Sequence, residues 1–541
     1  MKSLTFVTSI INIGSKHPDE TFESRLDNLK KLNVEQIVVF CDRDTMKSLY
    51  GNPRIVPFVD FHTESWIYKA SLPYADRMPH NRNETKDTFL HLCLSQMKIE
   101  FLKKAIEANP FNSTHFAWID PHICQLFHDS KLVINYLKYL SRQQFTNGPF
   151  ITMPGCWSSE PVDFNAVCWR FCGNFMLGDA ASILNLHSLY EKLYANVLRE
   201  KNMMTWDVNM LAHLEHLFSP IWFKANHDNS IVKVPSSLYS KRLSDPIIKY
   251  KYPEVSGFYP SSASYINNLL FTRYVNYRID NNGAYTINNA TGQIQTTNVV
   301  SYLSNDFTTI LESYIIDDSA LGIPTYNSGR YIGLEDVRIF NCANLRNLAF
   351  VASSASYTKG HEIRIVRGEF SLADKKFING EVLEPPTHLP SFCEKNWIPL
   401  SDGKFIFRWH PYEIGVCHDN MPMKIISSRV ISNSLFEKVR GSTIPVWSDV
   451  DACYTCVVHW SEVGPLQYYH MLVRLDGDYN VIEWSNPFHF SRIGIQYCLG
   501  FTIIDPETYG FWFSENDGNP GFIRSCSSQF FFQGWDYIDE P

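Results

Sequence analysis

The feature that most constrains the fold is a change in periodicity near residue 245. Before it, apolar strand-like runs alternate with segments of helical spacing, and residues 85–109 form the clearest such segment, with Pro110 just beyond. After it, helical periodicity nearly vanishes and short strand-like runs recur between Asn, Gly and Asp turn residues. The sequence therefore predicts an α/β domain over residues 1–245 and an all-β domain over residues 246–541, joined through the Ser-, Pro- and Tyr-rich residues 236–262.

Composition limits the class of protein. The chain has 541 residues, 45% of them hydrophobic and 19% charged, which is typical of a globular protein with about two to four domains. A net charge of −8 without any Lys/Arg-rich run argues against a nucleic-acid partner. We also expect no membrane span, because no window of about eighteen apolar residues exists. The short apolar N-terminus is interpreted as a first strand, and thirteen scattered cysteines favour reduced thiols in the cytoplasm.

An apolar run in the first half ends abruptly in polar residues. Phe116 to Ile119 precede Asp120-Pro-His122. This pattern indicates a central strand with polar residues at its C-terminal end, the edge where open α/β sheets bind ligands. The spacing of Asp120 and His122 would let both reach one cation, and oxygen plus imidazole suit Mn²⁺, Mg²⁺ or Zn²⁺. The alternative is that Pro121 merely ends a strand and Asp120 caps a turn.

Several short motifs of the first half occur in an order that can be compared with a known family. They are Thr5-Phe-Val-Thr, Ile37-Val-Val-Phe-Cys-Asp, Trp118-Ile-Asp120, Cys172-Gly-Asn-Phe-Met-Leu-Gly178, Trp206-Asp207 and Asn226-His227-Asp228. This order resembles the HtrL/YibB family, glycosyltransferase-like proteins related to nucleotide-sugar enzymes. The resemblance implies a GT-A-like, Rossmann-type α/β domain in which Asp120 stands where the family fold keeps a D-x-D metal carboxylate. Here the motif is Asp-Pro-His instead.

That resemblance gives the polar residues of the first half expected roles. A Mn²⁺ or Mg²⁺ ion held by Asp120, with His122 or His227, would neutralise a nucleotide diphosphate leaving group. Asp207, in the first turn of an expected helix, is the candidate base for an acceptor hydroxyl. The alternatives are that Asp207 complements the helix dipole and that His227 is a surface turn residue.

Polar clusters interrupt the strands of the second half, which we interpret as a propeller or a large barrel. The clusters contain one acidic pair and several Arg, Lys and His, a mixture that suits a carboxylic acid acting on a sugar beside an anion such as phosphate. The resemblance described next assigns roles to residues of these clusters: Asp336 as the candidate catalytic residue, and as candidate substrate-binding residues Asn276, Glu335, Arg338, Lys395, Asn396, Arg440, His459, His470 and Asp517.

The order of these clusters resembles the inverting β-mannoside phosphorylases and hydrolases, which are five-bladed β-propellers. The signature of that family, Gly-x-Glu-Asp-x-Arg, is matched by Gly333 to Arg338, with Val337 where a proline is common in the family. The resemblance implies that Asp336 is the general acid and that the basic residues and His459 bind an anion or sugar. The alternative is a salt-bridged turn, with no catalytic role.

Three functions are compatible with these features. The first is a glycosyltransferase that moves a sugar from a nucleotide-sugar donor to a glycan or glycoprotein acceptor, with the propeller binding or processing the glycan. The second is a mannoside phosphorylase, hydrolase or mannosyltransferase acting through the propeller, with phosphate or a sugar 1-phosphate as partner. The third is a non-catalytic glycan-binding protein. We rank the glycosyltransferase first.

Overall fold

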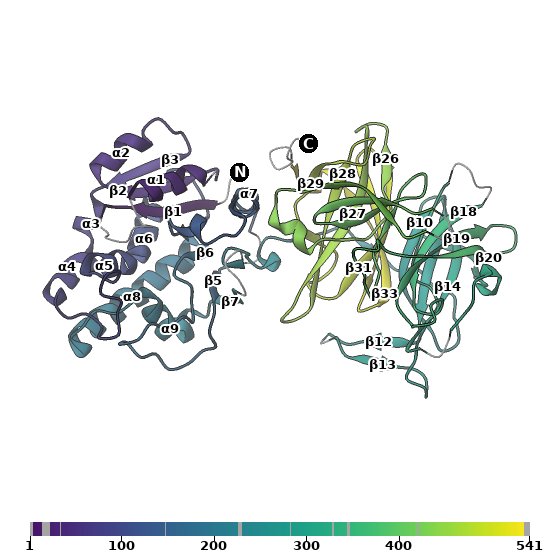
Figure 1. Ribbon diagram of the computed structural model, residues 1–541, viewed down its shortest axis with the longest axis horizontal. Helices are drawn as coiled ribbons and strands as arrows, with labels where there is room; N and C mark the ends of the chain where they lie inside the picture. Colours follow the sequence, from purple (N-terminus) through teal and green to yellow (C-terminus); the bar gives the residue numbers. More distant parts are fainter. Residues whose placement is uncertain are drawn as a thin grey trace. The chain divides into compact units, whose positions relative to one another are not determined.

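The structure, a computed structural model, describes residues 4–12, 22–32, 34–145, 148–225, 230–281, 283–326, 329–342, 347–418 and 421–534 (Figure 1). The chain divides into two compact units, Met1–Tyr239 and Ser240–Pro541. Unit 1 is built of helices and one sheet, and unit 2 is built almost entirely of strands. The change in periodicity therefore marks a real change in architecture, and the units separate six residues before the expected end of the first domain at 245.

Unit 1 has a seven-stranded mixed sheet in the order β3-β2-β1-β4-β6-β5-β7. Its strands are β1 (Leu4–Ile10), β2 (Ile37–Cys41), β3 (Ile55–Val59), β4 (His115–Ile119), β5 (Ile151–Gly155), β6 (Phe175–Asp179) and β7 (Ile221–Lys224). Strands β1 to β4 pair in parallel, whereas β6 runs antiparallel to β4 and β5. Every residue of β2 and β4 is buried, as expected of central strands covered on both faces.

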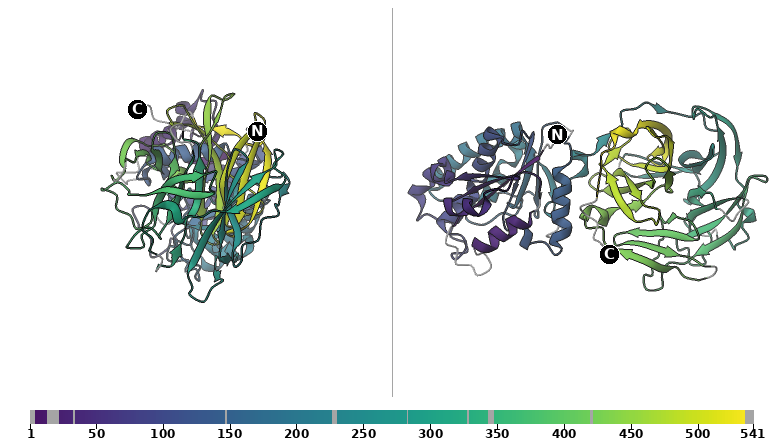
Figure 2. Two further views of the ribbon diagram at one scale, coloured as in Figure 1. Left: turned by 90° about the vertical axis from the view of Figure 1, so that its right-hand side faces the viewer. Right: turned by 90° about the horizontal axis from the view of Figure 1, so that it is seen from above.

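Helices lie on both sides of this sheet (Figure 2, right). They are α1 (Phe22–Lys31), α2 (Arg43–Leu49), α3 (Phe61–Glu64), α4 (Trp66–Ser71), α5 (Phe89–Gln96), α6 (Lys98–Ala108), α7 (Ser130–Ser141), α8 (Ala180–Lys201) and α9 (Asp207–Phe218). The single helix expected over residues 85–109 is two helices, α5 and α6, which are separated at Met97, where ψ is −8° although the backbone stays in the right-handed helical region. Among the described residues, no helix combines the length and the apolar character needed to cross a bilayer.

Unit 2 consists of separate, mainly antiparallel sheets arranged around a common centre (Figure 2, right). One sheet contains β10 (Tyr259–Ile266), β11 (Leu269–Val275), β14 (Ile294–Leu303), β15 (Ile310–Ile315) and β16 (Tyr331–Ile332). The next two contain β17 (Glu335–Phe340), β18 (Leu348–Ser354), β19 (Arg364–Ser371) and β20 (Lys376–Leu383), then β21 (Ile398–Pro399), β22 (Lys404–Trp409), β23 (Tyr412–Val416) and β24 (Lys424–Arg429). A two-stranded ribbon pairs β12 (Tyr277–Ile279) with β13 (Tyr285–Ile287).

The last two sheets recruit strands from the start and end of unit 2. The larger has eight strands: β8 (Lys241–Arg242), β25 (Arg440–Gly441), β26 (Val446–Ser448), β27 (Cys453–Glu462), β28 (Gln467–Leu475), β29 (Val481–Ser485), β30 (Phe488–His489) and β34 (Phe532–Gln533). The other has β31 (Gln496–Asp505), β32 (Thr508–Glu515), β33 (Gly518–Cys526) and β9 (Ile247–Ile248). Residues 241–242 and 247–248 of the expected connector thus belong to sheets of unit 2, where pairing satisfies backbone groups.

These sheets confirm a propeller-like arrangement but correct the expected set of five blades. Four sheets have the four or five strands of a blade, a fifth sheet has eight strands, and β12 and β13 form a separate two-stranded ribbon. Short strands from the start, middle and end of unit 2 enlarge the eight-stranded sheet, so it is not a repeat of the others.

Aromatic rings fill the space between the sheets of unit 2. Phe511 on β32 is fully buried, and its ring lies within 5.9 Å of the ring centroids of Phe488, Phe490, Phe501 and Phe530. Such rings contribute both large apolar area and favourable edge-to-face contacts. The aromatic content of the sequence is thus explained in large part by the core of the propeller.

We predict that Phe511→Ala lowers the free energy of unfolding of unit 2 by about 3–5 kcal/mol, because it leaves a cavity among packed rings. Phe531→Ala is the matched control, since that ring is 64% exposed, and it should change the free energy by less than about 0.5 kcal/mol. Denaturant unfolding followed by tryptophan fluorescence measures both. Equal effects of the two substitutions would contradict the packing described above.

Candidate active site

A cavity of about 390 Å³ in unit 2 gathers polar residues from several sheets. Its contributors include β11, the start of β17, the residues before β21, β25, β27, the start of β31 and the turn after β32. A propeller brings such positions together because its innermost strands all border the central axis. The cavity has a size typical of small-molecule sites.

Seven of the predicted residues of unit 2 line this cavity. They are Glu335, Asp336, Lys395, Asn396, Arg440, His459 and Asp517. These residues span more than 180 positions of the chain, so their convergence is a property of the fold and not of any local motif. Their catalytic and binding roles remain predictions.

An arginine that the sequence did not single out lies at the centre of the charges. Arg273 on β11 places one guanidinium nitrogen 3.1 Å from Asp336 Oδ1 and another 3.5 Å from Glu335 Oε1. Lys395 Nζ lies 2.9 Å from Glu335 Oε2. Burial alone would raise the pKa of the Asp336 carboxyl, but Arg273, Arg338 and Lys395 outweigh it, so its pKa lies below its ordinary value.

The pKa of Asp517 is shifted in the opposite direction from that of Asp336. Its carboxylate accepts a hydrogen bond of 2.8 Å from the Tyr277 hydroxyl. Burial raises the pKa of Asp517 above its ordinary value despite Arg273, and the nearby Asp336 and Glu335 carboxylates add to the rise. Two carboxyl groups of one cavity are thus driven apart in acidity, a pattern that is common in acid–base sites.

Three polar residues of the lining have left-handed backbone conformations. Asp336, Asn396 and Asp517 have φ values of 53°, 65° and 51°. Side chains other than glycine adopt this region at a cost, and such residues are concentrated at functional sites. Gly333 opens the same segment with φ 97°, and a Cβ there would lie 2.3 Å from the Thr296 carbonyl oxygen, so the motif requires glycine at this position.

Arg338 lies behind the cavity lining and holds it together. Its Nε donates to the Ser442 carbonyl oxygen at 2.7 Å, and its Nη2 donates to the Tyr497 hydroxyl at 2.8 Å. Gly441 lets this segment approach closely, since a Cβ there would lie 2.5 Å from the Asn396 carbonyl oxygen. Arg338 therefore positions the segment that carries Arg440, and it does not itself line the cavity.

Arg440 is the cation of the lining with the fewest protein partners. It is exposed, and its guanidinium makes no hydrogen bond or ion pair with any other residue that the structure describes. Its charge, with that of Arg338 and burial, lowers the pKa of His459 to about 3. His459 is consequently a neutral imidazole, with Nδ1 2.7 Å from Ser442 Oγ and its ring stacked on Tyr468.

Two predicted substrate-binding residues lie away from the cavity. The Asn276 side chain is buried and holds the backbone, since it donates to the Gln293 carbonyl at 2.9 Å and accepts from the Gln295 amide at 2.7 Å. His470 is fully buried between aromatic rings, and neither of its ring nitrogens hydrogen-bonds to another described residue. Burial lowers the pKa of His470 well below its ordinary value, so it is neutral.

Sequence reasoning missed Arg273 and the aromatic part of the lining. The missed lining residues are Arg273, Tyr277, Tyr285, Tyr331, Tyr468 and Tyr497. For Arg273 a signal existed, because it stands inside the otherwise apolar and hydroxyl-bearing run Leu269–Val275, where an unpaired charge would be costly. The tyrosines lack such a signal, because tyrosine is equally common in cores.

In unit 1, the predicted residues gather around a buried lysine. Lys98, the first residue of α6, donates to Asp207 Oδ2 at 2.8 Å and to the Gly173 carbonyl at 2.9 Å. Burial alone would lower the pKa of Lys98, but Asp207 and Asp120 outweigh it and raise the pKa. The cavity at these residues has a volume of only about 20 Å³.

The expected metal site in unit 1 stays a prediction. Asp120 Oδ1 accepts the backbone N–H of His122 at 3.1 Å, which is the turn-capping role considered as the alternative. His227 lies outside the described residues. Within the described ranges, no group of three or more His, Cys, Asp or Glu side chains could hold a metal ion. The residues present there do not by themselves form a Mn²⁺ or Mg²⁺ site.

No family model matches this sequence, and no curated protein matches it. Among solved structures, the chain is similar to a β-1,2-mannobiose phosphorylase from Listeria innocua, at 10% identity over 52% of this chain and 97% of that chain, with a TM-score of 0.34. It is also similar to a mannose phosphorylase from Leishmania mexicana in complex with phosphate ion (10% identity, 56% and 95% coverage, TM-score 0.30). A third is a GDP-Man-dependent mannosyltransferase from the same organism (12%, 52% and 88%, TM-score 0.31). Scores this low assign no activity to this chain.

The pKa of Asp336 is lowered and that of Asp517 is raised, so replacing each carboxyl group by an amide should have opposite effects on the stability of unit 2. The folded-state pKa of Asp336 lies below its unfolded value of about 3.9, so its ionised form stabilises the fold above that pH and the stabilisation is lost as the pH falls through the folded pKa. Asp336→Asn should therefore destabilise unit 2 by about 1–3 kcal/mol at pH 7.

Asp517→Asn is the matched substitution, and it should stabilise unit 2 at pH 7. The folded-state pKa of Asp517 is raised, so its ionised form costs stability above that pKa, and an amide removes this cost. Thermal unfolding of both variants at several pH values measures the effects. Destabilisation of similar size in both variants would show that the two carboxyl groups do not differ as described.

Proposed function

We propose that unit 2 is a glycoside-processing enzyme that acts on mannosides, with phosphate as the second substrate in its cavity. The observation that carries the proposal is the lining itself, which places one candidate acid, Asp336, beside three cations and a set of tyrosines. The resemblance of Gly333–Arg338 and the following clusters to inverting mannoside phosphorylases and hydrolases supports the same assignment.

The proposed reaction is an inverting displacement at the anomeric carbon. Asp336 donates a proton to the glycosidic oxygen as the bond from that oxygen to C1 breaks and its electron pair stays with the oxygen. A phosphate oxygen attacks C1 from the opposite face and forms the new bond, which yields a sugar 1-phosphate and a free sugar hydroxyl. The reverse direction makes a glycosidic bond from the sugar 1-phosphate.

Charge favours phosphate over water as the attacking group. Arg440 lines the cavity and has no ion-pair partner among the described residues, so its charge is available to an anion. An unpaired arginine in a cavity is suited to a phosphate, which it can bind through two hydrogen bonds. Phosphate would also offset the positive field on Asp336 and raise the pKa of that carboxyl toward the value an acid catalyst needs.

A second candidate function rests on unit 1. The Lys98–Asp207 pair with Asp120 beside it lies at the end of the parallel strand β4, where α/β sheets bind ligands. Transfer of a sugar from a nucleotide-sugar donor to a glycan or glycoprotein acceptor would use this edge. The small cavity there makes this the weaker of the two candidates.

We predict phosphate-dependent release of a sugar 1-phosphate from a β-mannobiose. Asp336→Asn should lower kcat/KM about 10²–10⁴-fold, which is the usual contribution of a general acid. Asp505→Asn is the matched control, because that carboxylate is exposed at the β31–β32 turn. Phosphorolysis that is unchanged in the Asp336 variant would refute the role of this residue.

The role of Arg440 in phosphate binding can be tested separately from that of Asp336. Arg440→Met should raise the KM for phosphate at least about tenfold, since a charged hydrogen bond of about 1.5–3 kcal/mol is lost. Arg429→Met, which changes an exposed arginine of β24 outside the cavity, should leave that KM unchanged. Steady-state kinetics at varied phosphate measures both. An unchanged KM in the Arg440 variant would remove phosphate from the proposed site.

A further inference from the structure

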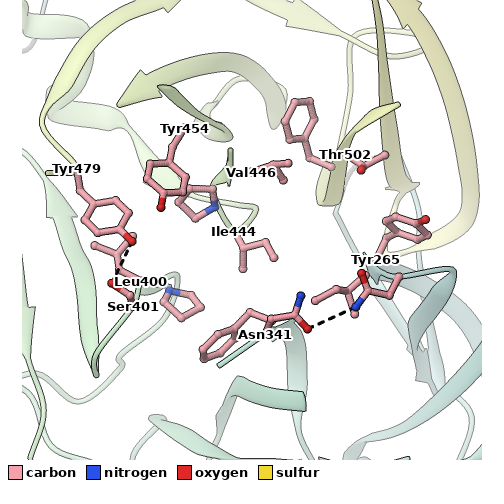
Figure 3. Close-up of a pocket in the computed structure, with 15 residues that line it drawn as sticks. Tyr265, Asn341, Leu400, Ser401, Ile444, Val446, Tyr454, Tyr479 and Thr502 are labelled. Carbon is pink, nitrogen blue, oxygen red and sulfur yellow. Dashed lines mark hydrogen bonds between the residues drawn. The ribbon is translucent and has the colours of Figure 1, made fainter. Parts of the chain in front are cut away.

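A second cavity of unit 2, about 460 Å³ in volume, is lined by residues from the same sheets (Figure 3). Strand β17 joins the two cavities: Glu335 and Asp336 at its start line the charged cavity, and Phe340 at its end lines the second one. Since a strand rises about 3.3 Å per residue, the two cavities lie roughly 13 Å apart along this strand.

Two further strands run between the cavities in the same way. On β27, Tyr454 lines the second cavity and His459 lines the charged one. On β31, Thr502 lines the second cavity and Tyr497 the charged one. The second cavity therefore opens at the opposite end of the inner strands, and we call it the neutral pocket.

The neutral pocket differs from the charged cavity in chemistry. Among the lining residues that the structure describes there is no Asp, Glu, Lys, Arg or His. Its polar groups are the amides of Asn267 and Asn341 and the hydroxyls of Ser401 and Thr502, together with tyrosines. Asn267 Nδ2 donates to Asn341 Oδ1 at 3.4 Å, so these two amides are held at the rim.

Aromatic rings form one wall of the neutral pocket. Tyr454 and Tyr479 are stacked with ring centroids 4.9 Å apart, and the Tyr479 hydroxyl donates to Ser401 Oγ at 3.2 Å (Figure 3). Just outside the lining, Trp447 packs edge-on against Tyr454 at 4.8 Å and is 42% exposed. The three rings form a continuous aromatic surface that reaches from the pocket to solvent.

We propose that the neutral pocket is a second saccharide-binding site, which takes an uncharged sugar unit. Amides and hydroxyls hydrogen-bond sugar hydroxyl groups, while an aromatic ring covers the apolar face of a pyranose. The lack of charged groups disfavours a phosphate or a nucleotide, which the other end of the propeller is equipped to bind. The inference rests on the proposed function only in the choice of a mannoside among the probes.

The test uses the full chain labelled with 5-fluorotryptophan and followed by ¹⁹F NMR. Trp447→Phe identifies the resonance of Trp447, which reports on the neutral pocket through its contact with Tyr454. The probes are β-mannobiose, cellobiose and diacetylchitobiose, each added up to about 50 mM, a range that detects even weak binding. We expect at least one probe to shift this resonance in a saturable manner.

Variants assign the shift to the pocket. Tyr479→Ala should weaken binding at least about tenfold, because it removes both a ring and a hydroxyl from the wall. Asn341→Leu, at an exposed position, removes one amide without disturbing the core and should also weaken it. Tyr314→Ala, which removes a partly exposed tyrosine of β15 outside both cavities, should have no effect.

Failure of the two proposals can be told apart. Asp336→Asn should lower phosphorolysis about 10²–10⁴-fold and leave the Trp447 shift intact, because Asp336 lines the charged cavity and not the neutral pocket. Absence of a Trp447 shift with all three probes would overturn the neutral pocket as a saccharide site, whether or not phosphorolysis occurs. A shift of equal affinity in Tyr479→Ala, Asn341→Leu and the parent would overturn it as well.

Discussion

The contact between Arg273 and the carboxylates of Glu335 and Asp336 is the constraint on which the site depends. These groups are largely buried, and a buried charge without a partner is costly. Arg273 comes from β11 and its partners from β17, so these ion pairs form only if the two neighbouring sheets are correctly positioned against each other. The positive φ of Asp336 fits the same view, because a strained backbone persists only where its surroundings hold it.

Charge is distributed unevenly along the inner strands of unit 2. One end carries the arginines, lysine, carboxyl groups and a neutral histidine, whereas the described lining of the other end consists of amides, hydroxyls, aromatic rings and aliphatic side chains. An inverting displacement needs a proton donor and an anion site at one end only. The arrangement therefore leaves the opposite end free for an uncharged ligand, so that one set of strands supports two different binding chemistries.

The sequence predicted the classes of both units because they rest on local periodicity. The local motif Gly333–Arg338 accounts for Glu335 and Asp336 of the charged cavity, whereas the other lining residues come from clusters that only the fold brings together. The sequence did not predict Arg273, and it selected Asn276 three residues away, because the face on which a strand residue lies depends on register that only the fold supplies. The contact of Lys98 with Asp207 is a similar case, because it joins residues more than 100 positions apart.

In the proposed site, phosphate binds close enough to Asp336 to raise the pKa of that carboxyl. The number of protons taken up when phosphate binds tests this most directly. Calorimetric titration of the parent with phosphate near pH 5.5, in two buffers of different ionisation enthalpy, counts the protons taken up on binding. If phosphate raises the pKa of Asp336, the parent takes up a fraction of a proton that Asp336→Asn does not. No phosphate binding, or the same proton count in both proteins, would contradict the account.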